Sequence, residues 1–213
     1  MANILIFGDS IAYGDYDLNG GWVTRLKIHY MRKVVKNKLE KNVNLFNQSI
    51  SGDTSIEVLS KLEIETKPRV WSEHETIFIF AFGINDSILI SNKPKVSLPV
   101  FESNLKKIYH TSSRYSEKIV FLGPTLVDES KVTPMPWSPT EYYYNERINK
   151  YNKAIKDHCN KTNSQFVDLF SKFSDLKYNK LLHDGCHLNT KGHETVFKII
   201  LQRLENGVLQ ATS

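Results

Sequence analysis

The sequence predicts an α/β protein in which a central parallel sheet of about five strands is covered by helices on both faces. The first observation is that short apolar runs, bounded by turn residues, alternate with longer segments of helical periodicity. The second is the continuous apolar run at residues 77–82, which suits a central strand buried on both faces. A single short run does not exclude a helix, so the prediction depends on the repeated β-α order.

The individual elements follow from this pattern along the chain. Strands are expected at residues 3–7, 43–47, 76–82, 118–122 and 165–169, and helices at residues 22–39, 55–66, 100–115, 140–162 and 189–204. The last helix shows the spacing most clearly, with apolar residues at i, i+3, i+4 and i+8 counted from Val196. Asn189 is its candidate N-cap, while Pro99 and Pro139 are candidate first-turn residues of two earlier helices.

Two connections, residues 87–98 and 123–139, are longer than the others. Both follow strands, and ligands of α/β sheets bind outside the carboxyl ends of the strands. These loops are therefore candidate walls of a substrate site, with rigid surface connections as the alternative. Trp137, Met135 and the apolar residues 88–90 either line an acyl pocket or pack the loops against the sheet.

Composition is that of an ordinary globular protein and argues against disorder and fibrous repeats. The chain has 213 residues, of which 40% are hydrophobic and 24% charged, and fits a single domain spanning residues 1–213. The formal net charge of +5 comes from scattered Lys and Arg residues at spacings typical of solvated helix faces. We therefore expect no nucleic-acid partner.

The chain shows no signal for a membrane or a secretory route. No run approaches the roughly 18 apolar residues of a membrane span, and the apolar residues 4–7 are too few for a secretory signal. Cys159 and Cys186 are too few for a disulfide framework. We expect a cytoplasmic protein, unless a signal was removed from the chain.

Four short polar motifs stand after predicted strands or before the last predicted helix. In chain order they are Gly8-Asp9-Ser10, Ser51-Gly52-Asp53, Gly83-Ile84-Asn85-Asp86 and Asp184-Gly185-Cys186-His187. Each motif alone is often a turn or a helix cap. The carboxyl ends of parallel strands meet at one edge of a sheet, so motifs that follow them are expected to converge there.

These motifs contain the components that acyl transfer needs. Ser10 is the candidate nucleophile, and its hydroxyl needs a base because it is weakly nucleophilic at neutral pH. His187 is the candidate base, and Asp184, three residues before it, can orient the imidazole. The N–H of Gly52 and the side-chain amide of Asn85 can donate to the oxyanion that forms. The Gly-x-Ser-x-Gly elbow of the standard α/β-hydrolases is absent around the serine.

Taken together, the four blocks resemble the SGNH, or GDSL-type, esterases and lipases over nearly the whole chain. The resemblance implies a flavodoxin-like three-layer α/β/α fold and a catalytic triad of Ser10, His187 and Asp184. It also implies an oxyanion hole built from the N–H groups of Ser10 and Gly52 and the side chain of Asn85.

The last block departs from the family pattern in two places. Leu188 stands where proline is common, and Cys186 lies between the two triad residues, while Asn189 is kept. Neither departure removes a catalytic group, although the helix start after His187 is expected to be less rigid without the proline.

The implied activity is hydrolysis of carboxylic esters through an acyl-enzyme, with short acyl groups favoured because the chain is compact and shows no large apolar lid. The expected partner is a small-molecule ester, with no cofactor and no metal. Natural substrate, acyl-chain length and oligomeric state stay open. An acyltransferase or a carbohydrate deacetylase would use the same residues.

Three further alternatives stay open from the sequence. One is a non-catalytic binding module on the same fold. The second is a metal site formed by His183, Asp184, His187 and His193, although their spacing matches no standard zinc motif. The third makes His183 the base in place of His187. The remaining histidines are expected at the surface, namely His29, His74, His110 and His158.

Overall fold

The structure is a computed structural model that describes residues 1–36, 42–162 and 164–208. Its strands are β1 (Ala2–Gly8), β2 (Val43–Asn47), β3 (Glu75–Ala81), β4 (Leu89–Ile90), β5 (Lys93–Pro94), β6 (Ile119–Leu122), β7 (Glu141–Tyr142) and β8 (Gln165–Val167). Its α-helices are α1 (Ser10–Tyr13), α2 (Gly21–Val35), α3 (Ser55–Thr66), α4 (Leu98–Ser113), α5 (Glu129–Val132), α6 (Asn145–Thr162), α7 (Leu169–Ser174) and α8 (Thr190–Arg203). Short helical turns of other types are η1 (Lys67–Arg69), η2 (Tyr178–Leu181) and η3 (Leu204–Val208).

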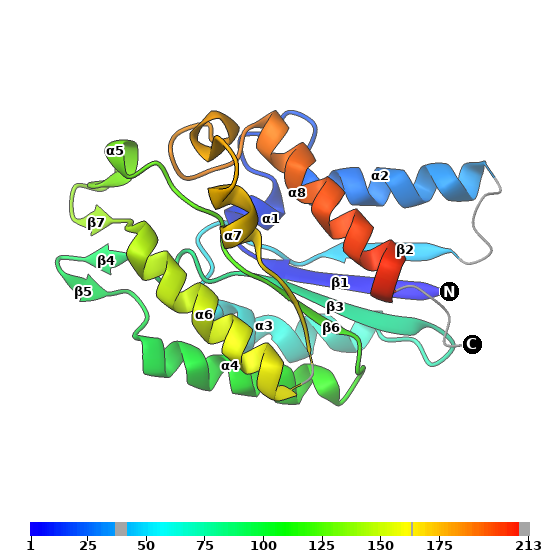
Figure 1. Ribbon diagram of the computed structural model, residues 1–213. Helices are drawn as coiled ribbons and strands as arrows, with labels where there is room; N and C mark the ends of the chain where they lie inside the picture. Colours follow the sequence, from blue (N-terminus) through cyan, green and yellow to red (C-terminus); the bar gives the residue numbers. More distant parts are fainter. Residues whose placement is uncertain (37–41, 163, 209–213) are drawn as a thin grey trace.

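The central sheet has five parallel strands in the order β2-β1-β3-β6-β8, which confirms the predicted fold class. This is the flavodoxin-like order, in which the chain moves to one side of β1 for β2 and to the other side for β3. Ligands of such sheets bind outside the strand ends at this reversal point. In Figure 1 all strands of the sheet run away from the N-terminus and end at the same edge.

Successive side chains of each strand point to opposite faces of the sheet and thereby form two separate apolar cores. In β1, Ile4 and Ile6 face the layer of α2 and α8, whereas Leu5 and Phe7 face the layer of α3, α4 and α6. The second core is rich in aromatic rings, and the centroids of Phe80 and Phe121 lie 5.0 Å apart. Full burial of one such side chain stabilises the fold by about 1.5 to 3 kcal/mol. The many buried side chains of the two cores together fix the strands, and with them the strand ends that carry the polar motifs.

A third apolar cluster lies at the carboxyl edge of the sheet. It includes Ile88, Met135 and Tyr143, which pack together with residues from the long loops. The small antiparallel sheet β5-β4-β7 lies beside this cluster and was not predicted. Ile88 and Met135, each 3% exposed, thus pack the two long loops together.

Several element boundaries differ from those predicted. The helix expected from residue 140 begins at Asn145, because residues 141–142 pair with β4, and Pro139 lies in the turn before that pairing. The helix expected over 22–39 ends at Val35, and residues 37–39 lie outside the described residues. His158, expected at the surface, is 8% exposed and packs edge-on against Phe121.

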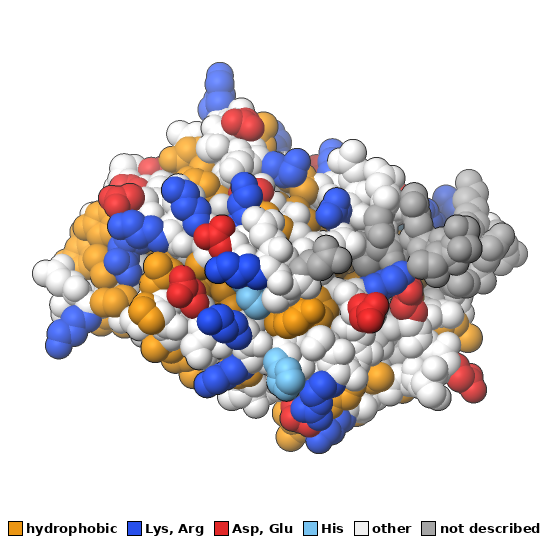
Figure 2. Space-filling view, turned by 60° about the horizontal axis from the view of Figure 1, so that its bottom comes forward, with side chains coloured by type: hydrophobic (Ala, Val, Ile, Leu, Met, Phe, Trp, Pro, Cys, Tyr) orange, Lys and Arg blue, Asp and Glu red, His pale blue; other side chains and the backbone are white. Residues whose placement is uncertain are grey.

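Charged side chains on the face seen in Figure 2 are mixed in sign. Lys and Arg side chains alternate there with Asp, Glu and apolar groups and form no single basic stripe. Among the described helices, none has the length and apolar character needed to cross a membrane.

Candidate active site

Ser10 is presented at the carboxyl end of β1 by a helix start. The Asp9 side chain caps α1 by accepting the Ile11 N–H at 3.0 Å, so the chain turns sharply just before Ser10. Gly8 is required at this turn, because a Cβ there would lie 2.6 Å from the Ala81 carbonyl oxygen. The N–H of Ser10 is at the first position of the helix and therefore has no carbonyl partner within it.

His187 lies against Ser10. Its Nε2 is 3.0 Å from Ser10 Oγ, and its Nδ1 is 2.7 Å from Asp184 Oδ2. The other carboxylate oxygen of Asp184 accepts the backbone N–H groups of Cys186 at 2.9 Å and His187 at 2.8 Å. The carboxylate is thereby fixed in the turn and determines the orientation of the imidazole.

Burial acts to raise the pKa of Asp184, but these hydrogen bonds outweigh it and hold the pKa well below the usual range of an aspartate. Asp184 is therefore an anion at neutral pH. An anion beside Nδ1 keeps the proton on that nitrogen and leaves Nε2 free to accept one from Ser10. The three side chains can therefore activate the serine hydroxyl.

The turn that carries Asp184 is tightly packed. Gly185 has φ +104°, and a Cβ at this residue would lie 2.7 Å from the Cβ of Lys131. Asn189 caps α8 by accepting the N–H groups of Lys191 and Gly192, and its own amide donates to the Lys180 carbonyl at 2.9 Å. The helix start after His187 is thus held by Asn189, with no need for the proline that the family pattern contains.

Asn85 follows β3 and is held on both sides. Its Nδ2 donates to the Asp53 carbonyl at 2.9 Å, and its Oδ1 accepts the hydroxyl of Tyr143 at 2.9 Å. One of the two amide N–H bonds is used by Asp53, which leaves the second available to an oxyanion. Gly52 precedes Asp53, has φ +87°, and has no heavy atom within 4 Å of a built Cβ, so the space beside it is open.

The hydrogen bond from Asn85 joins the second and third sequence motifs in space. Ile50, at the end of the loop from β2, donates to the Gly8 carbonyl at 3.2 Å, which brings the second motif to the first. The structure therefore places Ser10, Asn85 and the Gly52 turn at one edge of the sheet, next to His187.

Below Asn85, a buried carboxylate ties β3 to α3. Asp86 accepts the Ser55 N–H at 3.0 Å and the Ser55 hydroxyl at 2.6 Å, and Asn104 in turn donates to that hydroxyl at 3.0 Å. Burial raises the pKa of Asp86 to about 6 and that of Asp9 to about 7. Through their hydrogen bonds to Ile11 and Ser55, these two buried side chains hold the backbone next to Ser10 and Asn85 in place.

His183 does not take the place of the base. Its ring stacks on Tyr16, with centroids 5.0 Å apart, and its backbone N–H donates to the His187 carbonyl at 2.7 Å. His193, the last member of the possible metal set, is fully buried, and its Nε2 is 3.4 Å from the Asp15 carbonyl oxygen. Within the described ranges, no group of three His, Cys, Asp or Glu side chains is placed to hold a metal ion.

Two of the residues at the site carry no sequence signal that would have revealed them. Tyr143 lies outside all four motifs and reaches Asn85 only because β7 folds back beside β4. Tyr16 lies in the loop after α1, and its ring centroid is 4.8 Å from that of His187.

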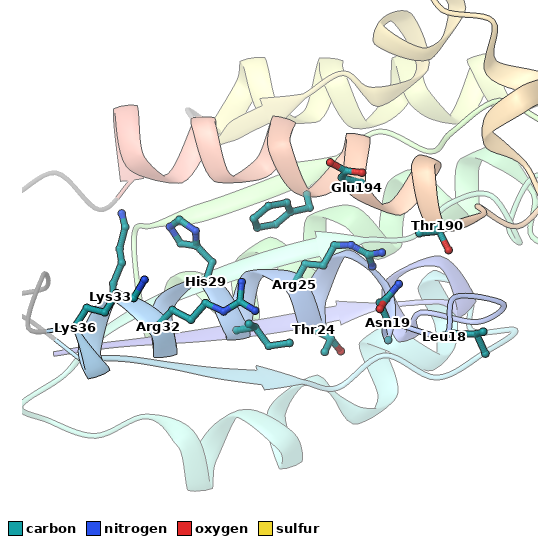
Figure 3. A pocket seen from close by; sticks show the side chains of 13 residues that line it. Leu18, Asn19, Thr24, Arg25, His29, Arg32, Lys33, Lys36, Thr190 and Glu194 are labelled. Atoms are coloured by element: carbon teal, nitrogen blue, oxygen red, sulfur yellow. The ribbon is translucent and has the colours of Figure 1, made fainter.

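A large groove runs between α2 and α8, and Figure 3 shows the side chains that line it. It has a volume of about 1000 Å³, and its labelled cations include Arg25, Arg32 and Lys33. Arg25 pairs with Asp17 and Lys33 with Glu205, so much of the positive charge is neutralised locally. The groove contains none of the Ser10, His187 or Asn85 groups and is not the reaction site.

The site combines a hydroxyl, an imidazole and a carboxylate in line with amide donors beside them, at the edge of a flavodoxin-like sheet. This arrangement is found in hydrolases that act on acyl groups. The chain belongs to the GDSL-like lipase/acylhydrolase family, whose model matches residues 6–195. It is accordingly a GDSL-type hydrolase acting on ester bonds.

Its relatives are similar over almost the whole chain. The isoamyl acetate-hydrolyzing esterase of Saccharomyces cerevisiae is 26% identical over 92% of this chain and 84% of the yeast protein. The human isoamyl acetate-hydrolyzing esterase 1 homolog is 26% identical over 96% of this chain and 82% of its own length.

Solved structures share the fold. A lipase/acylhydrolase from Enterococcus faecalis is 24% identical, covers 96% of both chains and superposes with a TM-score of 0.73. An acetyl xylan esterase from Geobacillus stearothermophilus is 18% identical, covers 99% of this chain and 97% of its own, and also has a TM-score of 0.73.

Proposed function

We propose that this protein is a serine esterase that hydrolyses carboxylic esters with short acyl groups through an acyl-enzyme on Ser10. The observation that carries the proposal is the continuous contact from Ser10 Oγ to His187 Nε2, at 3.0 Å, and from His187 Nδ1 to Asp184, at 2.7 Å. A serine that merely capped a helix would not need an imidazole oriented by a carboxylate.

The first half-reaction forms the acyl-enzyme. His187 Nε2 takes the Ser10 proton while Oγ bonds to the ester carbonyl carbon, and the carbonyl π pair moves to oxygen. Donors from Asn85, Gly52 and the Ser10 backbone stabilise this oxyanion. When the carbonyl reforms, the bond to the alcohol oxygen breaks and His187 returns the proton to that oxygen.

The second half-reaction repeats these steps with water. His187 takes a proton from water, whose oxygen bonds to the acyl carbon, and the bond to Ser10 Oγ then breaks. Oγ regains the proton from His187, and the carboxylic acid leaves. Asp184 keeps its charge throughout and stabilises the imidazolium in both halves.

Two observations support short acyl groups. Ile88 and Met135 of the long loops are each 3% exposed and pack within the third apolar cluster, so these two side chains do not line a channel for a long acyl chain. The relatives are named for isoamyl acetate, and a structural neighbour for acetyl xylan, both of which carry an acetyl group.

The test is hydrolysis of p-nitrophenyl acetate, butyrate and octanoate by the wild type and by Ser10→Ala. We expect the rate to fall with acyl length in the wild type and to be at background in the variant. Ser113→Ala, a loss of an exposed hydroxyl on α4, is the matched control and should keep the wild-type rate.

A fluorophosphonate probe provides a second readout that is independent of the substrate. The wild type should gain the mass of one phosphonyl group on Ser10, and Ser10→Ala should gain none. Labelling of another serine, or equal turnover by the wild type and Ser10→Ala, contradicts the proposal. Adding an alcohol acceptor and analysing the products distinguishes hydrolysis from acyl transfer.

A further inference from the structure

Helix α2 exposes three apolar side chains that lie on one face, and we call them the α2 stripe. Ile28 is 39% exposed, Met31 53% and Val35 81%, and their i, i+3, i+7 spacing places them together. The buried side chains of the helix, which include Leu26 and Tyr30, lie on the opposite face against the core. A helix at the surface of a globular protein ordinarily has polar residues on its outer face. The packing of α2 on the core therefore does not account for the stripe.

The stripe is unusual among the long helices of this protein. In the described part of the chain these helices are α2, α3, α4, α6 and α8. Only α2 exposes three large apolar side chains, whereas α3 exposes Ile56 and Ile64, α4 exposes Val100, and α6 and α8 expose none. Isolated exposed apolar residues are normal in soluble proteins, while several that adjoin one another are typical of a contact surface.

The charge of α2 is entirely positive. The cations of the helix and its C-cap are Arg25, Lys27, Arg32, Lys33 and Lys36. The helix contains no Asp or Glu, although each of the other four long helices contains at least one. Arg25 and Lys33 pair with carboxylates from outside the helix. Lys27, Arg32 and Lys36 are exposed and have no carboxylate partner among the residues that the structure describes, so their charge is available to a ligand.

These three cations flank the α2 stripe. A helix turns by about 100° per residue, which places Lys27 on one side of the stripe and Arg32 and Lys36 on the other. Arg32 and Lys36 form a hollow of about 260 Å³ together with the stripe residues, and both also line the groove toward α8 (Figure 3). The surface thus has apolar groups at its centre and positive charges at its margins.

This arrangement fits an anionic membrane surface. Apolar side chains on the outward face of a helix can enter the boundary between headgroups and acyl chains, while cations beside them meet the lipid phosphates. An acidic peptide seated in the groove beside α8 is a poorer match. Met31 and Val35, the most exposed members of the stripe, do not line that groove and would stay uncovered.

We infer that the α2 stripe, together with Lys27, Arg32 and Lys36, is a docking surface for an anionic membrane, to which the folded protein binds peripherally. Such binding requires no membrane-spanning helix. The surface contains none of the residues of the proposed catalytic machinery. The inference therefore stands apart from the esterase activity, and each can fail without the other.

The experiment measures co-sedimentation of the purified protein with vesicles of two compositions. One set contains phosphatidylcholine and phosphatidylserine in a ratio of about 7:3, and the other contains phosphatidylcholine alone. We expect the wild type to bind the anionic vesicles at least about tenfold more strongly than the neutral ones. Binding to the anionic vesicles should weaken as salt is added, because exposed charges are screened.

Two double variants test the two parts of the surface. Arg32→Gln combined with Lys36→Gln should weaken binding to the anionic vesicles by about 20-fold, since each cation near the membrane contributes about fivefold. Met31→Gln combined with Val35→Gln should weaken it by about tenfold, because apolar area no longer enters the bilayer.

Matched control variants lie on the other side of the sheet. Lys153→Gln combined with Lys156→Gln removes two exposed cations from α6 and changes the net charge by the same amount. Ile64→Gln removes an apolar side chain on α3 that is 72% exposed. Both controls should bind as the wild type does, and circular dichroism should show the native helix content in every variant.

Three outcomes contradict the inference. The first is a wild type that does not bind the anionic vesicles, and the second is equal binding by the wild type and both α2 variants. The third is a wild type that binds no vesicles but forms dimers in sedimentation velocity, with either α2 variant dissociating them. In that case the stripe joins two copies of the chain and the membrane assignment is wrong.

Discussion

The hydroxyl of Tyr143 donates to Oδ1 of Asn85 over 2.9 Å and thereby determines which end of the amide faces the oxyanion. The Asp53 carbonyl on the other side can only accept, so it must face the amide nitrogen, which lies at 2.9 Å. Burial, with a smaller effect from Cys186, raises the pKa of Tyr143 well above its usual range, so its hydroxyl remains a donor. Tyr143 is thus a positioning residue for Asn85.

Replacing Tyr143 with Phe should lower kcat for p-nitrophenyl acetate by roughly 10- to 100-fold and change KM by less than about twofold. The reason is that the amide of Asn85 would lose its fixed orientation, and its donor matters mainly when the oxyanion forms. Tyr144→Phe changes the neighbouring side chain, which is half-buried and stacks on Tyr142, and should keep the wild-type kcat.

A double mutant separates positioning from a general structural effect. If Tyr143 acts through Asn85, adding Tyr143→Phe to Asn85→Ala should cause no further loss of kcat. A further loss as large as in the wild-type background would mean that Tyr143 acts through another group, and the positioning role would then be rejected.

The sequence predicted the sheet well, because its strands are local apolar runs between turn residues. Residues 43–47 and 55–66 match β2 and α3 at both ends, and α3 begins with a capping box of Thr54 and Glu57 that is readable in the sequence. The motifs that follow β1, β2 and β3 were placed correctly because all parallel strands end at one edge.

What could not be predicted depends on contacts between distant parts of the chain. The strands of the small sheet are two residues long and exist only through mutual pairing, as between Leu89 and Tyr142. The role of Tyr143 depends on that pairing. His158 was expected at the surface because the sequence shows no partner for it, although its spacing from Tyr151 and Ile155 puts it on the apolar face of α6. The ring that it packs against, that of Phe121, comes from a distant strand. Short-range patterns carry no information on such contacts.

His187→Ala should lower kcat/KM on the order of 1000-fold or more, because the serine loses its base, whereas His183→Ala should lower it by less than about tenfold. Only the His187 ring is within hydrogen-bonding reach of Ser10, while the His183 ring packs against Tyr16. Steady-state hydrolysis of p-nitrophenyl acetate at pH 7 measures both. The reverse ranking of the two variants would make His183 the base.

Asp9→Asn should remove part of the fall in the free energy of unfolding that the wild type shows as the pH rises. In the folded protein, burial raises the pKa of Asp9 from 3.8 to about 7, so the folded state binds more protons than the unfolded state between these values. This group therefore lowers the free energy of unfolding by about 1.4 kcal/mol for each pH unit in that window. The asparagine can still cap α1 through its side-chain oxygen.

Urea denaturation at pH 5 and pH 7 measures this effect. Asp9→Asn should gain stability relative to the wild type as the pH rises between these two values. Asp157→Asn, at an exposed position of α6, serves as the control for losing a carboxylate at the surface. A stability difference between Asp9→Asn and the wild type that is constant with pH would show that Asp9 ionises in the folded state as it does in the unfolded chain.

Cys159 and Cys186 should resist thiol reagents in the native protein, although Cys186 lies between two residues of the proposed triad. Both are free and buried. Burial raises the pKa of Cys159 to about 12 and that of Cys186 above its usual range, so the reactive thiolate is scarce at pH 8. With the aromatic disulfide reagent DTNB, we expect almost no colour from the native protein, release of both thiols in urea, and unchanged esterase activity in the treated native sample. Rapid native reaction accompanied by loss of activity would show instead that the turn around Cys186 opens to solvent, and the triad geometry would then be a transient arrangement.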